Sequence, residues 1–186
     1  MLTQQGKREA ILTAYLNLIV YQGMRAATLE ALGVACGLSK AGVLYHFSSM
    51  DALRQGIFAE LRAQAAADAH RMLADPPNAA RYYVVSSQRR DSLLERLIEA
   101  VYRLGQTGDE AALELLRTCR EGWYEALLQG LGDELLAKLV LFAGDGINHN
   151  ALLSLGEGDE SFLGASVATD LLGMIERLQQ AAGPRA

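Results

Sequence analysis

Residues 28–47 read TLEALGVACGLSKAGVLYHF, and this stretch decides the fold that the sequence predicts. Thr28 and Ser39 each precede a short apolar segment, where a side-chain hydroxyl can accept a hydrogen bond from a free N–H of the first helical turn. Gly37 separates the two segments, and glycine readily adopts the left-handed backbone that ends many helices. The stretch therefore predicts two short helices, each starting at a hydroxyl residue, joined by a tight turn.

These two segments need a packing partner, because an isolated helix of about two turns is marginal in water. The preceding segment, from about Thr3 to Gln22, supplies one. Its apolar face consists of Ile11, Ala14, Tyr15, Leu18 and Ile19. We therefore predict a tri-helical head with a helix-turn-helix, the arrangement that places its second short helix in the major groove of duplex DNA.

The rest of the chain is also predicted to be helical, since apolar residues recur every three or four positions and strand-like alternation is nearly absent. We expect longer helices at 51–73, 91–105, 109–130, 133–154 and 160–181. Residues 81–87 are aromatic and β-branched, and they fit a short helix, an extended stretch or a mobile lid. The predicted fold is all-α, with a helix-turn-helix DNA-binding domain at 1–50 and a ligand-binding and dimerisation bundle at 51–186.

The head resembles the TetR family of bacterial transcription regulators over about residues 8–53. The motif GLSK at 37–40, followed by LYHF at 44–47, carries the resemblance. It implies a homodimer, formed through the last two helices, that binds a palindromic DNA operator. It also implies a ligand pocket in the remaining helices. The expected function is therefore a repressor released by a small-molecule inducer, with activation as a variant of the same idea.

Three residues differ from the pattern that this family usually shows. Gly33 and Cys36 stand where alanine is usual, and glycine costs up to ~1 kcal/mol of helix propensity. Met50 occupies the position of a lysine that would approach a phosphate. We therefore expect DNA affinity to be lower, or less dependent on salt, by about one phosphate contact per head.

Residues along the second short helix are the main candidates for DNA contact. Lys40 is suited to a phosphate or a guanine edge, and Tyr45 and His46 to a backbone phosphate. Other roles stay open, because Lys40 can be a solvated cation and the His46 imidazole can stabilise a helix end. The predicted DNA-contacting set is Thr28, Ser39, Lys40, Ala41, Gly42, Tyr45 and His46.

Polar residues follow the apolar segment 139–142 on a predicted bundle helix. Asp145 and His149 are four positions apart and share one helix face. They fit either a polar patch in a ligand pocket or a hydrogen-bonded pair in a dimer interface. Large side chains at helical spacing belong to cores more often than to ligand sites. The candidate ligand-binding set is Tyr102, Cys119, Trp123, Phe142, Asp145 and His149.

Charge and composition narrow the class of partner. The 186 residues carry a net charge of −5, which by itself opposes binding to a polyanion. The acidity lies in the second part of the chain, since residues 1–60 carry +1 and residues 61–186 carry −6. No apolar run approaches the ~20 residues of a membrane span, and the first residues lack the apolar stretch of a signal peptide. We therefore expect a cytoplasmic protein with no membrane partner.

Two other classes of function compete with a regulator. An enzyme would use Asp145 and His149 as an acid–base pair, but the sequence shows no nucleophile beside a base and no phosphate-binding glycine loop, so we predict none. The second alternative is a head that has lost its DNA affinity and binds another protein. Met50 and the net negative charge of the chain are compatible with it. Cys36 and Cys119 are expected to pack in helix faces, with no disulfide, metal site or cofactor.

Overall fold

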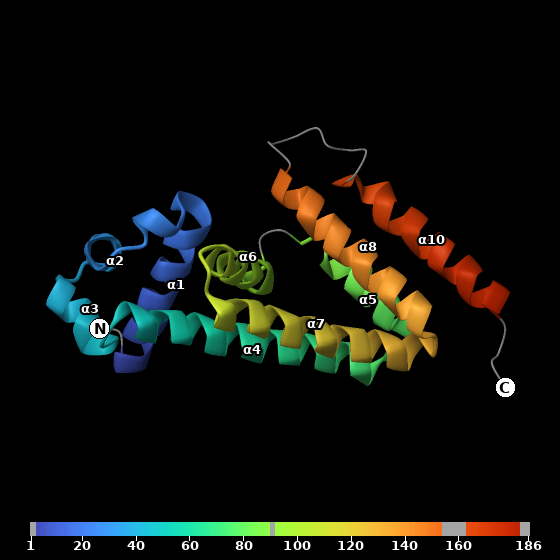
Figure 1. Ribbon diagram of the computed structural model, residues 1–186, viewed down its shortest axis with the longest axis horizontal. Helices are drawn as coiled ribbons and strands as arrows, with labels where there is room; N and C mark the ends of the chain where they lie inside the picture. Colours follow the sequence, from blue (N-terminus) through green and yellow to red (C-terminus); the bar gives the residue numbers. More distant parts are fainter. Residues whose placement is uncertain (1–2, 90–91, 154–162, 183–186) are drawn as a thin grey trace. The chain divides into compact units, whose positions relative to one another are not determined.

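The computed structural model describes residues 3–89, 92–153 and 163–182, and every regular element within them is a helix (Figure 1). The α-helices are α1 (Gln4–Gln22), α2 (Leu29–Cys36), α3 (Lys40–His46), α4 (Met50–Ala74), α5 (Ala79–Ser86), α6 (Leu93–Gln106), α7 (Glu110–Leu131), α8 (Glu134–Leu153) and α10 (Ala165–Ala182). Short 3-10 helices, Met24–Ala26 and Pro76–Asn78, precede α2 and α5. The all-α prediction is confirmed, and no helix of the described residues is long and apolar enough to cross a membrane.

The segment at 81–87, for which the sequence allowed three conformations, is helical through Ser86 because it lies within α5. Ala79, Ala80, Tyr83 and Val84 are buried, and this spacing of three and four gives α5 a single apolar face. Three of the predicted helices, 91–105, 133–154 and 160–181, reach beyond the described residues, since positions 91, 154 and 160–162 lie outside them.

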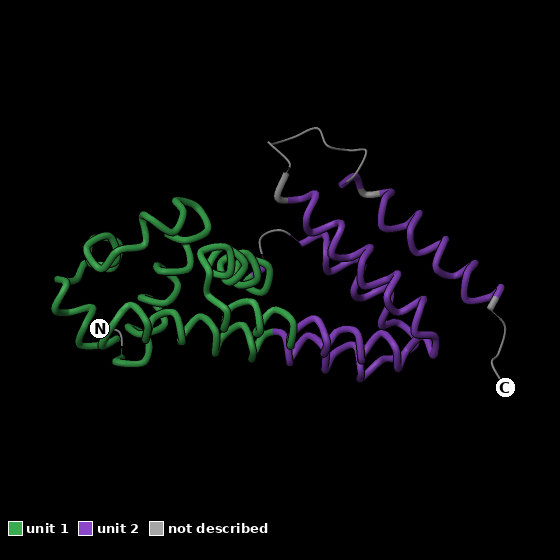
Figure 2. Tube along the Cα trace, viewed as in Figure 1, with its two compact units in different colours: residues 1–64, 93–118 green, residues 65–92, 119–186 purple. Residues whose placement is uncertain are grey.

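Contacts divide the chain into two compact units, drawn in different colours in Figure 2. The head unit is Met1–Gln64 with Leu93–Thr118, and the bundle unit is Ala65–Ser92 with Cys119–Ala186. The long helices α4 and α7 each contribute to both units. A domain boundary between residues 50 and 51 stays a prediction. The head unit takes in the start of α4, all of α6 and the start of α7 as well.

In the head unit, α1 packs against α2, α3 and α6, and its side chains Ile11 and Ile19 are both 0% exposed. Two arginines attach α6 to α1. Arg103 Nη1 donates a hydrogen bond to the Ile19 carbonyl over 2.8 Å, and Arg96 Nη1 donates one to Asn17 Oδ1 over 3.0 Å. The Ile19 carbonyl lies near the end of α1, where the helix dipole favours a cation. The short helices α2 and α3 therefore pack on α1, which is itself fastened to α6 by packing and by hydrogen bonds from two arginines.

In the bundle unit, α5 packs against α8, and α10 packs against both. Gly144 of α8 permits the close approach of α5, because a Cβ atom there would lie 2.4 Å from Tyr83 Cε1 and 2.8 Å from Ser87 Oγ. Any larger residue at this position would displace the Tyr83 ring, which is buried beside α8. The absence of a side chain at Gly144 thus leaves room for the Tyr83 ring where it lies.

Gly33 has a structural purpose that helix propensity does not reveal. A Cβ atom at Gly33 would lie 2.6 Å from the backbone carbonyl oxygen of Leu38, in the turn between α2 and α3. We expect Gly33→Ala to lower the free energy of unfolding by roughly 1–3 kcal/mol, because overpacking against a backbone group outweighs the gain in helix propensity of up to ~1 kcal/mol.

Chemical denaturation of the two proteins checks this prediction, with Gly42→Ala as the control. A Cβ atom at Gly42 would meet nothing closer than 3.4 Å, which is an ordinary contact, so this variant should be as stable as the wild type or more so. An increase in stability for Gly33→Ala would contradict the steric argument.

Candidate nucleic-acid interface

The helix ends around the turn are formed by the residues that the sequence indicated. Thr28 Oγ1 accepts a hydrogen bond from the Ala31 N–H over 3.1 Å, and Ser39 Oγ accepts one from the Gly42 N–H over 3.1 Å. Gly37 has φ 64° and ψ 33°, the left-handed conformation. The prediction of two capped short helices joined at a glycine is therefore confirmed.

The inner face of α3 fastens this helix to the head. Val43 is 0% exposed and Phe47, the residue just after α3, is 2% exposed. The Arg8 guanidinium of α1 lies 4.2 Å from the centre of the Phe47 ring and donates a hydrogen bond to the His46 carbonyl. Such a contact combines a cation–π attraction with satisfaction of a carbonyl at a helix end. The orientation of α3 is thus determined from the buried side.

The outer face of α3 is open to solvent. Ser39, Lys40 and Ala41 are exposed at its start, and the Tyr45 side chain is 75% exposed at its other end. Gly42 is half-buried between them. Thr28, at the start of α2, is also exposed. Six of the predicted DNA-contacting residues can therefore reach a partner from one capped and anchored pair of helices.

His46 is the exception, because it is only 9% exposed. Its ring packs edge-on against Tyr45, with 5.2 Å between the ring centres. Its buried Nδ1 atom has no hydrogen-bond partner among the described residues. This position favours a role in supporting Tyr45, and contact of the imidazole with DNA stays a prediction.

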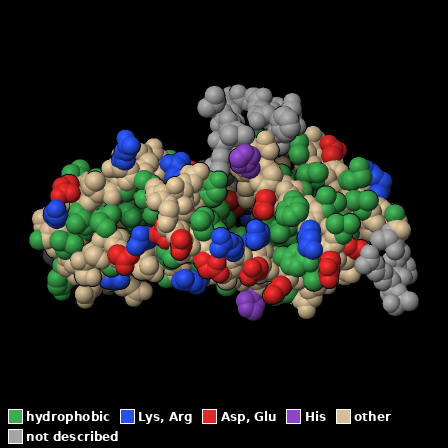
Figure 3. Space-filling model, viewed as in Figure 1, with side chains coloured by type: hydrophobic (Ala, Val, Ile, Leu, Met, Phe, Trp, Pro, Cys, Tyr) green, Lys and Arg blue, Asp and Glu red, His purple; other side chains and the backbone are tan. Residues whose placement is uncertain are grey.

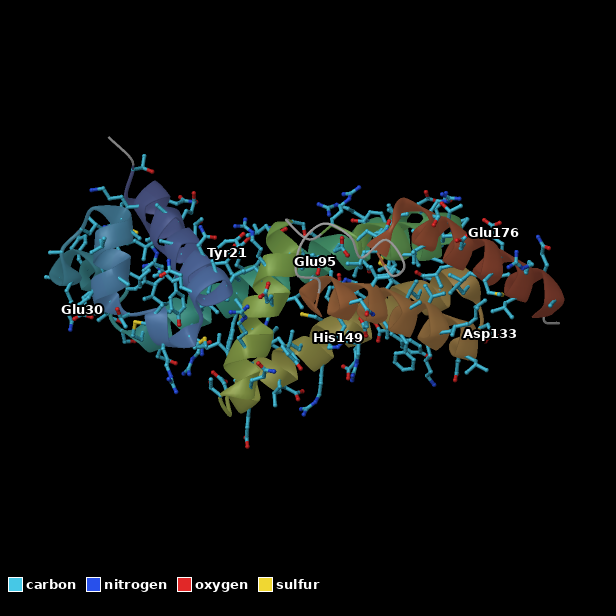
Figure 4. All side chains as sticks on the ribbon, turned by 90° about the horizontal axis from the view of Figure 1, so that it is seen from above. Tyr21, Glu30, Glu95, Asp133, His149 and Glu176 are labelled. Atoms are coloured by element: carbon cyan, nitrogen blue, oxygen red, sulfur yellow. The ribbon has the colours of Figure 1, made fainter. Side chains whose placement is uncertain are left out.

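An ion pair on the outer face was not anticipated from the sequence. Lys40 Nζ donates to Glu30 Oε1 over 2.7 Å, with both side chains more than half exposed. The hydrogen bond from Lys40 lowers the pKa of the Glu30 carboxyl below its usual value. Glu30 is labelled in Figure 4. The positive charge of Lys40 on this outer face is therefore partly neutralised by its own protein.

We expect Glu30→Gln to tighten binding to duplex DNA by about twofold to tenfold, because it releases Lys40 and removes a negative charge that faces the same partner. Titration of a labelled duplex at several salt concentrations measures the change, and the affinity should also become more sensitive to salt. Glu9→Gln is the matched control, since it removes an exposed carboxylate from α1. Equal affinities of the two variants would mean that Glu30 does not act on DNA.

The comparisons with known proteins agree with this geometry. Residues 11–57, which span the helix-turn-helix and its supports, match the family model described as bacterial regulatory proteins, tetR family. The match shows a DNA-binding domain of the tetR type over these residues. A TetR-family head of this kind is a DNA-binding domain of a transcription regulator.

Two solved structures match this chain over most of its length. AmtR from Mycobacterium smegmatis has a TM-score of 0.60 and 16% sequence identity, over 89% of this chain and 94% of AmtR. That likeness supports the same fold over nearly the whole length. The multidrug binding protein EbrR, solved in complex with imidazole, has 19% identity over 91% of this chain and 94% of EbrR, with a TM-score of 0.40. No curated protein matches the sequence.

Four of the six candidate ligand-binding residues are exposed, and the other two are buried. Tyr102 lies on α6 in the head unit and is 48% exposed, and Phe142 on α8 is 63% exposed. Cys119 and Trp123 of α7 are buried, while Asp145 and His149 of α8 are exposed. In the described residues no hydrogen bond joins Asp145 to His149, although one helix face carries both. The ligand-binding role of the whole set stays a prediction.

Tyr83, which was not among the candidates, connects two of them. Its hydroxyl donates a hydrogen bond to Asp145 Oδ1 over 3.1 Å, and its ring centre lies 6.3 Å from that of Trp123. Burial raises the pKa of the Asp145 carboxyl above its usual value, against the opposing effects of this hydrogen bond and of the Arg120 guanidinium. Tyr83 and Asp145 are 62 positions apart, so no local pattern could have paired them.

Proposed function

We propose that this chain is a TetR-family repressor that binds a palindromic operator as a homodimer and leaves it when a small molecule binds. The observation that carries the proposal is the open face of α3, where Ser39, Lys40 and Tyr45 are exposed on a helix anchored from its other side. A helix presented in this way fits the major groove of duplex DNA. Residues 1–50 would form the DNA-binding domain and residues 51–186 the ligand-binding and dimerisation domain.

Exposed apolar side chains on the last two described helices support the homodimer. On α8, Leu135, Leu139 and Phe142 are 77%, 47% and 63% exposed, and their spacing places them along one stripe. On α10, Met174 and Leu178 are 50% and 40% exposed. Figure 3 draws hydrophobic side chains on the surface of the bundle unit. Large exposed apolar patches mark interaction surfaces, and a second copy of the chain is the partner that we propose.

Release would depend on the spacing between two heads. A dimer that reads successive major grooves needs its recognition helices about 34 Å apart. A small molecule that binds better to a conformation with another spacing lowers the affinity for DNA, and DNA lowers the affinity for that molecule by the same factor. We place this binding in the bundle, where Trp123 and Asp145 lie near one another through Tyr83.

Selection of bound duplexes from a random pool tests the proposal. The expected result is enrichment of an inverted repeat, bound by one dimer per duplex in sedimentation, with affinity that falls steeply as salt rises. The selected duplex, placed between a promoter and a reporter gene, should then lower expression when the protein is present. No binding to any duplex at low ionic strength would refute DNA binding, and raised expression would refute repression.

A further inference from the structure

Three helices of the bundle unit bring an indole, a phenol and a carboxylate together. Trp123 comes from α7, Tyr83 from α5 and Asp145 from α8. Tyr83 is the common neighbour, since its hydroxyl binds Asp145 Oδ1 at 3.1 Å and its ring centre is 6.3 Å from that of Trp123. Gly144 permits this placement, because a Cβ atom there would occupy the space of the Tyr83 ring.

Trp123 offers a hydrogen-bond donor that the protein does not use. The residue is only 8% exposed, and its buried Nε1 atom has no acceptor among the described residues. A buried donor without an acceptor is unfavourable, and most buried donors in proteins are paired. A bound molecule with an acceptor atom near the indole would satisfy this group.

Asp145 offers a negatively charged hydrogen-bond acceptor, whereas Trp123 offers a donor. The residue is exposed to solvent although its carboxyl is partly buried, so a molecule can reach it, and within the described residues Tyr83 is its hydrogen-bond donor. The positive Arg120 guanidinium acts on it only as a charge at a distance. A carboxylate has acceptor capacity for several donors, and charged donors form the strongest hydrogen bonds with it.

We propose that Trp123, Tyr83 and Asp145 form a binding site for a protonated amine or amidine that also carries a hydrogen-bond acceptor. The cationic N–H groups of the ligand bind Asp145, its acceptor receives the hydrogen bond of Trp123 Nε1, and its apolar part lies against the Tyr83 ring. The inference rests on the proposed function in one respect, since it takes molecules of this class to be the effector that releases the protein from DNA.

The negative charge of the site sets its selectivity. An anion of the same shape would meet the Asp145 carboxylate and be repelled, and a neutral isostere would lose the charge-assisted hydrogen bond. Burial raises the pKa of Asp145, which is consistent with a carboxylate that gains from a bound cation. The order of affinity is therefore cation, neutral molecule, anion.

Fluorescence offers a direct experiment, because Trp123 is the one tryptophan of the sequence. The probes are para-methoxybenzamidine, para-methoxybenzamide and para-methoxybenzoate, which share a ring and an ether acceptor but differ in charge. We expect the amidine to change the Trp123 emission saturably and to bind about tenfold or more tightly than the amide. Para-ethylbenzamidine, which lacks the acceptor, should bind several-fold more weakly than para-methoxybenzamidine.

Two variants separate the role of Asp145 from general effects of charge. Asp145→Asn should reduce the ratio of amidine to amide affinity to near one, whereas Asp170→Asn, an exposed carboxylate on α10, should leave it unchanged. An unchanged ratio in Asp145→Asn overturns the proposal. Equal affinities of the wild type for amidine and amide, or no saturable change with the amidine, overturn it whether or not the variant folds.

The same measurements distinguish this site from the proposed function. Binding of the probes requires no DNA, so the site can be confirmed even if no duplex is bound. If the amidine binds with the expected charge preference and also lowers the affinity for the selected duplex, both inferences are supported. If it binds and leaves the affinity for that duplex unchanged, the site stands and its identification as the effector site is wrong.

Discussion

Replacing Lys40 and Tyr45 together by alanine is expected to weaken binding to the selected operator by about a hundredfold or more. Both side chains project from the open face of α3, and each is lost twice in a dimer. Lys40 supplies a cation for a phosphate, and the Tyr45 hydroxyl supplies a hydrogen-bond donor. Because both side chains are exposed, the variant should keep the helical content, the thermal stability and the dimer of the wild type.

The control for this double variant is Arg62→Ala combined with Tyr21→Ala. It removes an exposed cation from α4 and an exposed tyrosine from the end of α1, away from α3 (Tyr21 is labelled in Figure 4). Its operator affinity should stay within about twofold of the wild type. Titration of the labelled operator with each protein decides the matter, and an unchanged affinity of the Lys40 and Tyr45 variant would remove α3 from the DNA interface.

Local chemistry explains why the head could be predicted from sequence. A hydroxyl before a helix and a glycine after one act within four residues, so Thr28, Gly37 and Ser39 indicate the helix ends directly. The reason for a glycine at position 33 is not local in this way, because it depends on where the fold places the Leu38 carbonyl. Helix propensity therefore gives the cost of this glycine, whereas the close approach that it allows is visible only in the fold.

The electrostatics of the site depend on distances that no periodic pattern contains. The ion pair between Glu30 and Lys40 crosses the turn between α2 and α3, and its length is set by the geometry of that turn. His46 is covered because the chain around it packs onto α1, which its residue type does not indicate. Spacing alone put Asp145 beside His149, whereas its hydrogen-bond partner is Tyr83 on another helix.

Replacing Phe142 by glutamate is expected to convert the dimer into a monomer at micromolar concentration. Phe142 is 63% exposed on α8 and continues the stripe of Leu135 and Leu139. In an interface with twofold symmetry each substitution occurs twice, so two apolar contacts are lost and two carboxylates enter a desolvated surface. Sedimentation should therefore give the mass of one chain, with helical content unchanged because the side chain does not belong to the core of the bundle unit.

The same variant should lose about a hundredfold or more in operator affinity, although its DNA-contacting residues are intact. Two linked heads bind adjacent half-sites with a high effective concentration, and separate heads lose that advantage. Tyr21→Glu is the control, since it introduces the same charge in place of an exposed aromatic residue of the head unit. A dimeric Phe142→Glu protein would show that another surface joins the two copies. A monomer with undiminished operator affinity would show instead that each head binds DNA independently, and release by a change in head spacing would then have no physical basis.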